Sequence, residues 1–319
     1  MSTRIPLRSA ALALVAALTL TACGGSADDA GEAAVDRGSD AAFPRTVEHA
    51  MGSTEIPARP ERVVVLDTGE LDSALALGVT PVGAVTTAVD SEFLSYLADD
   101  AEGVEVVGTI PEPDLEAIAA LGPDLILSNS VRHEELYDQL AQIAPTVFAG
   151  DLGDTWKANF ELAAEALGLE EDGERLLEEY EADAAALGEE IGDPAGTTIS
   201  TIRFVDGLIR VYTADSFIGT VMADIGLDHL QLPTDRTPTF AELGAEQLTL
   251  ADAGIVLYSS YGPIDESGEA QALAGPLWPR LTAVADGRAF EVDDDVFYTG
   301  IGLRAATLQL EQLRELLAG

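Results

Sequence analysis

The sequence predicts an α/β protein made of two Rossmann-like lobes joined by a long rigid helix. In the first half, short β-branched runs alternate with segments of helical spacing, which is typical of a mostly parallel, doubly wound sheet. The segment from Thr155 to about Gly192 has no strand signal and carries apolar stripes at helical spacing, so it can join two lobes rigidly. Strand and helix patterns alternate again in the second half.

The first half contains five expected strands. The first is the β-branched run Arg62–Leu66, which ends in the turn-forming residues Asp67-Thr68-Gly69. The other four expected strands are 81–85, 104–107, 123–127 and 146–148. Helices are expected between them, at 70–77, 113–121 and 134–143, and glycines follow the first two as helix C-caps.

The middle segment breaks at Gly168, so it is one long helix or two consecutive helices. Its two apolar stripes are Trp156, Phe160, Ala163, Ala164 and Leu167, and then Leu176, Leu177, Tyr180, Ala184 and Leu187. In the second half, Asp206-Gly207 between strands 198–205 and 208–212 indicates a hairpin. The remaining expected elements are helices at 216–225, from 246 and at 301–317, and strands at 254–258 and 288–292.

The N-terminus has the pattern of an exported lipoprotein. Arg4 and Arg8 precede the uncharged apolar run Ala10–Leu20, which is short for a bilayer span and typical of a signal-peptide core. The following Leu20-Thr21-Ala22-Cys23 resembles a bacterial lipobox, in which the cysteine becomes the lipidated first residue and carries fatty acids such as palmitate. The alternative is an ordinary secretory signal with a chance cysteine.

The chain divides into five expected regions. Because Cys23 is the only cysteine, an intramolecular disulfide is excluded. Residues 26–42 are rich in Gly, Ala, Ser and Asp and lack the apolar content to fold, and no later apolar run is long enough to span a membrane. The regions are a signal peptide (1–22), a lipidated flexible tether (23–45), a first α/β lobe (46–154), a bridging helix (155–193) and a second α/β lobe (194–319).

The formal net charge of -41 and the sequence pI of about 4.1 restrict the partners. Phosphate repels such a surface, so we expect no nucleic-acid binding. Anionic lipid repels it as well, so the lipid anchor must hold the protein at the membrane.

Read together, these stretches resemble the siderophore-type periplasmic binding proteins, the helical-backbone class that also serves cobalamin and haem importers. The resemblance covers about residues 45–319, and the order and spacing of its pieces are more specific than any one of them. The matching stretches are 60–66, 77–83, 114–118, 121–126, 144–147, 203–204, 209–212, 281–284 and 287–288.

The resemblance implies a class III periplasmic binding protein: two α/β lobes bridged by a helix, with the ligand in the cleft between them. It implies capture of a ferric siderophore outside the membrane and its delivery to the permease of an ABC importer. Cobalamin or haem are the alternatives within this class. We expect no cofactor and no direct metal ligand, because the chelator holds the iron. We also expect the protein to be a monomer whose lobes make only a small opening motion.

Arginine side chains are the first candidates for ligand contacts, because guanidinium groups fork onto the oxygen donors of anionic chelates. Arg132 follows strand 123–127, near the strand ends where ligands of open α/β sheets bind, although it could pair with a neighbouring glutamate instead. Arg203 and Arg210 lie on the second-lobe hairpin, and we leave open whether they share a face. Arg236, in a polar loop, is a further candidate. The family implies ligand-binding arginines near Arg132 and on this hairpin.

Aromatic and acidic residues complete the expected site. Tyr212, Tyr261 and Tyr298 are expected to line the cleft because polar, glycine-containing segments surround them, and Trp156 either lines it too or anchors the bridging helix. Two glutamates match positions where the family carries acidic residues that pair with permease arginines. These are Glu116 in the first lobe and Glu246 in the second, and Glu242 is a second candidate for the position of Glu246. The alternative interpretation is that these glutamates lie on a solvated helix face and have no docking role.

Other classes of function are weaker readings. The three histidines, His49, His133 and His229, are far apart in sequence, which disfavours a bare-metal site, although His133 could touch a ligand. An exported hydrolase is the enzyme alternative, but neither a Gly-x-Ser-x-Gly elbow nor a His-Glu-x-x-His motif is present. A structural surface protein would have no pocket. Among siderophores, a trihydroxamate ranks before a catecholate, because an acidic protein repels a trianion unless arginines dominate locally.

Overall fold

The first lobe is built on a six-stranded sheet in the order β6-β5-β4-β3-β7-β8, in which only β6 is antiparallel to its neighbour. The computed structural model describes residues 43–88, 91–192, 196–233 and 239–317, which belong to one unit. The strands are β3 (Val63–Val65), β4 (Gly83–Thr86), β5 (Glu105–Thr109), β6 (Glu112–Pro113), β7 (Leu125–Asn129) and β8 (Thr146–Ala149). The strand order reverses between β3 and β7, which makes their carboxyl ends a topological switch point.

A hairpin of β1 (Arg45–His49) and β2 (Gly52–Ile56) precedes this sheet. It is tied to β8 by hydrogen bonds from Ala50 N to Phe148 O (3.0 Å) and from Thr54 Oγ1 to Thr146 O (2.8 Å). The sequence pattern did not predict the hairpin, because each strand has a single buried residue, Val47 or Ile56.

Short helices follow the strands of the first lobe. Asp67, Asp114 and Asn129 are the N-caps of α1, α2 and α3, and each side chain accepts a backbone N–H of the first helical turn. Asp67 and Asn129 sit at the carboxyl ends of β3 and β7, so the caps also place polar side chains at the switch point. The helices are α1 (Thr68–Ala76), α2 (Leu115–Leu121), α3 (Ser130–His133), the 3₁₀ turn η2 (Glu134–Leu136) and α4 (Tyr137–Leu140).

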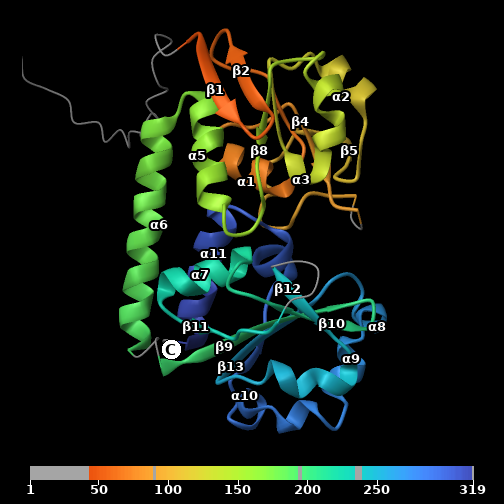
Figure 1. Cartoon of the computed structure of the whole chain (residues 1–319), viewed down its shortest axis with the longest axis vertical. Coiled ribbons are helices and arrows are strands. Elements are labelled where there is room, and N and C mark those ends of the chain that lie inside the picture. The colour runs from red at the N-terminus through yellow and green to blue at the C-terminus, as the bar shows by residue number, and fades with distance from the viewer. Residues whose placement is uncertain (1–42, 89–90, 193–195, 234–238, 318–319) are drawn as a thin grey trace, which may run out of the picture. The chain divides into compact units, whose positions relative to one another are not determined.

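The expected helical segment is two helices, α5 (Trp156–Leu167) and α6 (Glu170–Ile191). They separate at Gly168, whose φ of 70° suits glycine and where a Cβ would lie 2.7 Å from the Phe43 ring. α5 packs on α1, β1 and β8 of the first lobe, whereas α6 packs along α5, α7 and α11. Figure 1 shows α6 running beside both lobes, so within the expected helical segment α6, and not α5, forms the bridge.

The second lobe contains a mixed sheet in the order β12-β10-β9-β13-β14, with β11 beside β9. Asp206 (φ 50°) and Gly207 (φ 79°) turn β9 into β10, which confirms the predicted hairpin. The strands are β9 (Thr198–Val205), β10 (Leu208–Tyr212), β11 (Asp228–His229), β12 (Phe240–Leu243), β13 (Ile255–Ser260) and β14 (Ala289–Glu291). β10 is antiparallel to both neighbours, and β9, β11, β13 and β14 are parallel.

Helices cover this sheet and close the chain. They are α7 (Phe217–Ile225), η4 (Ala245–Ala251), α8 (Ile264–Ser267), α9 (Glu269–Leu273), η5 (Trp278–Arg280), α10 (Thr282–Ala285), the π-helical η6 (Asp295–Thr299) and α11 (Leu303–Leu317). Among the described residues, no helix is both long and apolar enough to cross a bilayer.

The start of α11 is held by the first lobe. Asp72 of α1 is fully buried, and its carboxylate accepts Arg304 N (2.9 Å), Ala305 N (3.0 Å) and the Tyr96 hydroxyl (3.0 Å). It therefore does for α11 what an N-cap side chain does for its own helix. The largest apolar cluster also includes residues of both halves, among them Val63, Ile199 and Leu310, so the lobes share one core.

Candidate binding cleft

Two adjoining hollows, with volumes of about 530 and 690 Å³, lie between residues of the two lobes. They share five lining residues, Val131, Arg132, Arg203, Tyr298 and Ile301. In the first lobe, the lining residues follow the carboxyl ends of the parallel strands: Asp67 after β3, Thr87 after β4, Ile110 after β5, Arg132 after β7 and Asp151 after β8. The cleft therefore occupies the position where open α/β sheets bind ligands.

Asp67 and Arg132 meet at the switch point between β3 and β7. Arg132 Nε donates to Asp67 Oδ2 at 3.0 Å, and the arginine side chain remains 44% exposed while that of the aspartate is 3% exposed. Asp67 Oδ1 also accepts Thr68 N at 2.7 Å, as the N-cap of α1. Arg132 is thus paired with a buried carboxylate and not with a neighbouring glutamate.

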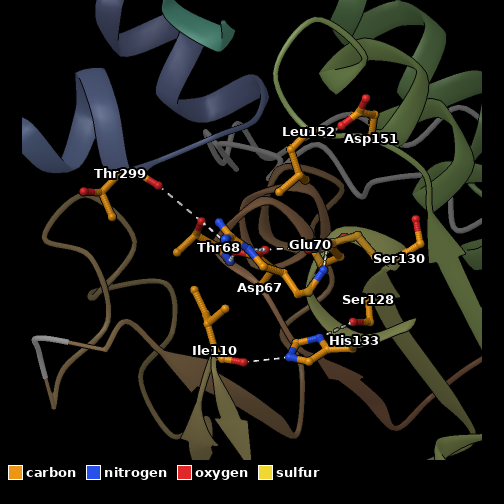
Figure 2. A network of polar contacts seen from close by, with 12 residues as sticks. Asp67, Thr68, Glu70, Ile110, Ser128, Ser130, His133, Asp151, Leu152 and Thr299 are labelled. Atoms are coloured by element: carbon orange, nitrogen blue, oxygen red, sulfur yellow. Dashed lines mark hydrogen bonds and ion pairs between the residues drawn. The ribbon is translucent and has the colours of Figure 1, made fainter. Parts of the chain in front are cut away.

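A second buried acidic side chain, Glu70, lies close to Asp67 (Figure 2). Asn129 Nδ2 bridges the two acids, donating to Asp67 Oδ2 (3.0 Å) and to Glu70 Oε1 (3.3 Å). Burial, and after it the negative charge of Asp67, raises the pKa of Glu70 to about 8. Glu70 is therefore largely protonated at neutral pH, while Asp67 stays paired with Arg132.

His133 is a structural residue and not a cleft contact. Its ring is buried, with Nδ1 2.7 Å from Ser128 Oγ and Nε2 2.7 Å from the carbonyl oxygen of Ile110 (Figure 2). A carbonyl only accepts, so Nε2 carries the proton and Nδ1 accepts from the serine. Burial lowers the pKa of His133, and the neutral ring ties the residues that follow β5 to β7.

Arg203 and Arg210 lie on one face of the second-lobe sheet, because they are directly opposed in the β9–β10 register. Arg203 forks onto Asp294, with Nε 2.8 Å from Oδ1 and Nη2 on Oδ2, and Nη2 also donates to Thr299 Oγ1. The guanidinium group lies over the Tyr261 ring, 4.3 Å from its centroid.

Arg210 is held more loosely than Arg203. Its Nε donates to Glu242 Oε1 at 3.3 Å, and the guanidinium lies 4.5 Å from the centroid of the Phe240 ring. The Arg210 side chain is 29% exposed, whereas that of Arg203 is 8% exposed. The structure thus brings three of the four candidate arginines, Arg132, Arg203 and Arg210, to one cleft.

The aromatic candidates divide between cleft and core. Tyr212 lines the larger hollow and Tyr261 the smaller one. Tyr298 borders both, but its hydroxyl donates to Leu257 O at 3.2 Å inside the second lobe, so the phenol hydrogen is already engaged within the lobe.

Trp156 is a core residue, and its assignment as a cleft contact has to be corrected. It is 2% exposed, its Nε1 donates to Thr220 Oγ1 at 2.9 Å, and its ring meets Tyr180 and Phe217 edge to face. Its position at the start of α5, facing α6 and α7, gives it the anchoring role that was the alternative prediction.

The remaining candidates lie away from the cleft lining or outside the described residues. Glu116 on α2 and Glu246 on η4 are exposed, one on each lobe. Arg236 and Cys23 fall outside the described residues. In the described part of the chain, no group of three or more His, Cys, Asp or Glu side chains is placed to hold a metal ion.

The sequence reading missed the carboxylates that hold the arginines. Asp67 was seen only as a turn residue, and Asp294 was not among the candidate residues. Both follow the ends of parallel strands, β3 and β14, and that position was a usable signal. Phe240, which lies under Arg210, belongs to a strand that the pattern did not predict.

Two α/β lobes, a helix along both and a polar cleft between them define a two-lobed solute-binding protein. Residues 63–296 match the periplasmic binding protein family, so the chain belongs to it. This confirms the resemblance and the fold class predicted from the sequence.

Named relatives agree with this assignment. The "Probable siderophore-binding lipoprotein YfiY" of Bacillus subtilis (strain 168) is 37% identical over 311 residues, which cover 94% of each chain. The "Fe(3+) dicitrate-binding periplasmic protein FecB" of Escherichia coli (strain K12) is 29% identical and covers 83% of this chain and 87% of its own. Among solved structures, Staphylococcus aureus SirA complexed with staphyloferrin B has a TM-score of 0.76 and 29% identity, over 86% of this chain and 98% of that one.

Proposed function

We propose that this chain captures a ferric siderophore in its inter-lobe cleft and delivers it to the permease of an ABC importer. The observation that carries the proposal is the convergence of Arg132, Arg203 and Arg210, from both lobes, on one cleft. Guanidinium groups suit oxygen-rich chelates because they donate in a planar fork and are always charged. The relatives named as siderophore-binding and ferric-dicitrate-binding proteins support the choice of ligand.

Cobalamin and haem remain the alternatives within the same class of transporter. The contact between Ser128 and His133 does not support the hydrolase alternative. Ser128 is 1% exposed, and the second ring nitrogen of His133 lies on a carbonyl and not on a carboxylate. A role as a binding protein without catalysis therefore fits the cleft better.

Delivery requires docking to the permease and retention at the membrane. Glu116 and Glu246 are exposed on separate lobes, where they would pair with permease arginines and set the docking register. Cys23 would carry the lipid that anchors a monomer at the extracytoplasmic face. Replacing Cys23 by Ser should abolish palmitate labelling and release the protein from the membrane fraction. Unchanged labelling would refute this anchor.

The ligand is tested by fluorescence quenching of the soluble domain with ferric hydroxamates, ferric catecholates, ferric citrate, haem and cobalamin. We expect binding to a ferric siderophore class. Arg132→Ala should weaken that binding at least about tenfold, as expected for the loss of one charged hydrogen bond. Arg175→Ala is the matched control, because among the described residues Arg175 pairs with Asp172 and Glu179 alone, on the surface of α6. Binding to none of the ferric chelates, or only to haem or cobalamin, would refute the proposal.

A further inference from the structure

Each cleft guanidinium group is held from the same side. Arg132 donates through Nε to Asp67 (3.0 Å), Arg203 through Nε to Asp294 (2.8 Å), and Arg210 through Nε to Glu242 (3.3 Å). The three carboxylates come from three different elements: the cap of α1, the start of η6 and strand β12. The same arrangement thus arises independently at three places in one cleft.

Holding a guanidinium group by Nε determines which of its edges faces the ligand. The five N–H donors lie in one rigid plane, so a carboxylate held at Nε occupies one side edge and leaves the end edge, formed by the two Nη atoms, for another partner. Among the described residues, Arg132 and Arg210 donate to carboxylates through Nε alone. Arg203 is more fully engaged, since Nη2 also contacts Asp294 and Thr299. Two of the three arginines therefore keep their terminal edges for a ligand.

The carboxylates also cancel the positive charge that the arginines bring. The described cleft lining has three arginines and four aspartates, of which Asp151, Asp154 and Asp215 are exposed. Glu242 and Asp294 add two further carboxylates in contact with Arg210 and Arg203. Because like charges in a cleft are poorly screened, this balance does not favour a highly anionic ligand.

We infer that Asp67, Glu242 and Asp294 are positioning residues that set the charge selectivity of the cleft. They orient the guanidinium groups and offset their charge, so that the cleft accepts oxygen-rich ferric chelates of low net charge and rejects trianionic ones. A ferric ion with three monoanionic hydroxamates is neutral, whereas three dianionic catecholates give a trianion. The inference rests on the proposed function and names the class of chelate that this site takes.

The test replaces each carboxylate by its neutral isostere: Asp67→Asn, Glu242→Gln and Asp294→Asn. Glu189→Gln is the control, because it removes one charge from the exposed surface of α6. Dissociation constants for a ferric trihydroxamate and a ferric tris-catecholate are measured for each protein at low and moderate salt, after circular dichroism has verified the fold. Glu242→Gln keeps the test usable if a change at Asp67 or Asp294 prevents folding, since Glu242 is 29% exposed.

We expect the wild-type protein to prefer the trihydroxamate at least about tenfold. Each cleft variant should raise the relative affinity for the catecholate at least about fivefold, more at low salt, while Glu189→Gln leaves it unchanged. An unchanged ratio in the folded cleft variants, or a wild-type preference for the catecholate, would overturn the inference and leave the siderophore function intact. Binding of no ferric chelate by the wild type would overturn both.

Discussion

Arg203 of β9 and Arg210 of β10 are register partners across an antiparallel pair, and both face the cleft. The row continues on either side, with Glu242 of β12 opposite Arg210 and Ser259 of β13 opposite Arg203. The two outer residues hold the two arginines in place. Glu242 accepts a hydrogen bond from Arg210, and Ser259 donates one to Asp294, which pairs with Arg203. One row across four strands thus builds the second-lobe wall of the cleft.

The two arginines of this row should differ in their effect on stability. Arg203→Ala removes the guanidinium group that pairs with the carboxylate of Asp294, so we expect the free energy of unfolding to fall by about 2–3 kcal/mol. Arg210→Ala breaks a longer, more exposed pair and should cost less than about 1 kcal/mol. Urea unfolding measures both. The double variant Arg203→Ala/Asp294→Ala should recover part of the loss, and equal effects of the two single variants would contradict the assignment.

Glu70 should make stability depend on pH. Its pKa is about 8 in the folded protein and near 4.5 in the unfolded chain, so the folded state binds more protons between these values. The contribution of Glu70 to stability is therefore present below about pH 4.5 and is lost as the pH rises towards 8. Glu70→Gln should remove this loss and raise the free energy of unfolding at about pH 9 by several kcal/mol, with an upper limit of about 5 kcal/mol set by the two pKa values, about 8 and 4.5.

Urea unfolding of the wild type, Glu70→Gln and the exposed control Glu189→Gln at about pH 5, 7 and 9 checks this effect. The control should follow the wild type at every pH. A Glu70→Gln curve parallel to that of the wild type would show that Glu70 titrates normally.

The hydrogen bonds between Asp72 and the start of α11 should couple the stability of this helix to the first lobe. Asp72→Ala leaves two backbone N–H groups and the Tyr96 hydroxyl without their acceptor, which should cost about 2 kcal/mol or more. Asp252→Ala is the matched control, because Asp252 caps α10 within the second lobe through Thr282 N and Oγ1. Hydrogen exchange should accelerate at the start of α11 only in Asp72→Ala. Equal protection there in both variants would exclude the coupling.

Gly219 should not tolerate a side chain. It lies in the first turn of α7, and a Cβ there would lie 2.1 Å from Thr213 O and 2.7 Å from Ala214 Cα, both backbone atoms that cannot move aside. Gly219→Ala should therefore lower the free energy of unfolding by about 3 kcal/mol or prevent folding. Gly150→Ala, where a Cβ meets nothing within 4 Å, is the control and should be nearly neutral. Thermal unfolding compares the two, and a stable Gly219→Ala protein would contradict the packing described here.

The hairpin shows how much of the site local sequence already contained. Asp206-Gly207 predicted a two-residue turn, and such a turn pairs Val205 with Leu208 and, counting outwards, Arg203 with Arg210. We left the shared face of the two arginines open, although the turn length was sufficient to decide it. The position of Arg132 after a parallel strand was equally readable, because strand ends of an open α/β sheet meet at one edge.

Local sequence was enough for the alternation of strands and helices, the hairpin register and the family, because periodicity and turn chemistry act over a few residues. Tertiary structure decided the rest. Trp156 enters the core, and the Tyr298 hydroxyl points into the second lobe. Asp294 reaches Arg203, and Asp72 reaches the start of α11. These contacts join residues far apart in the chain, and in a protein with 57 acidic residues no local pattern marks which carboxylate is buried beside an arginine. Packing selects the partner, because an unpaired buried charge is costly.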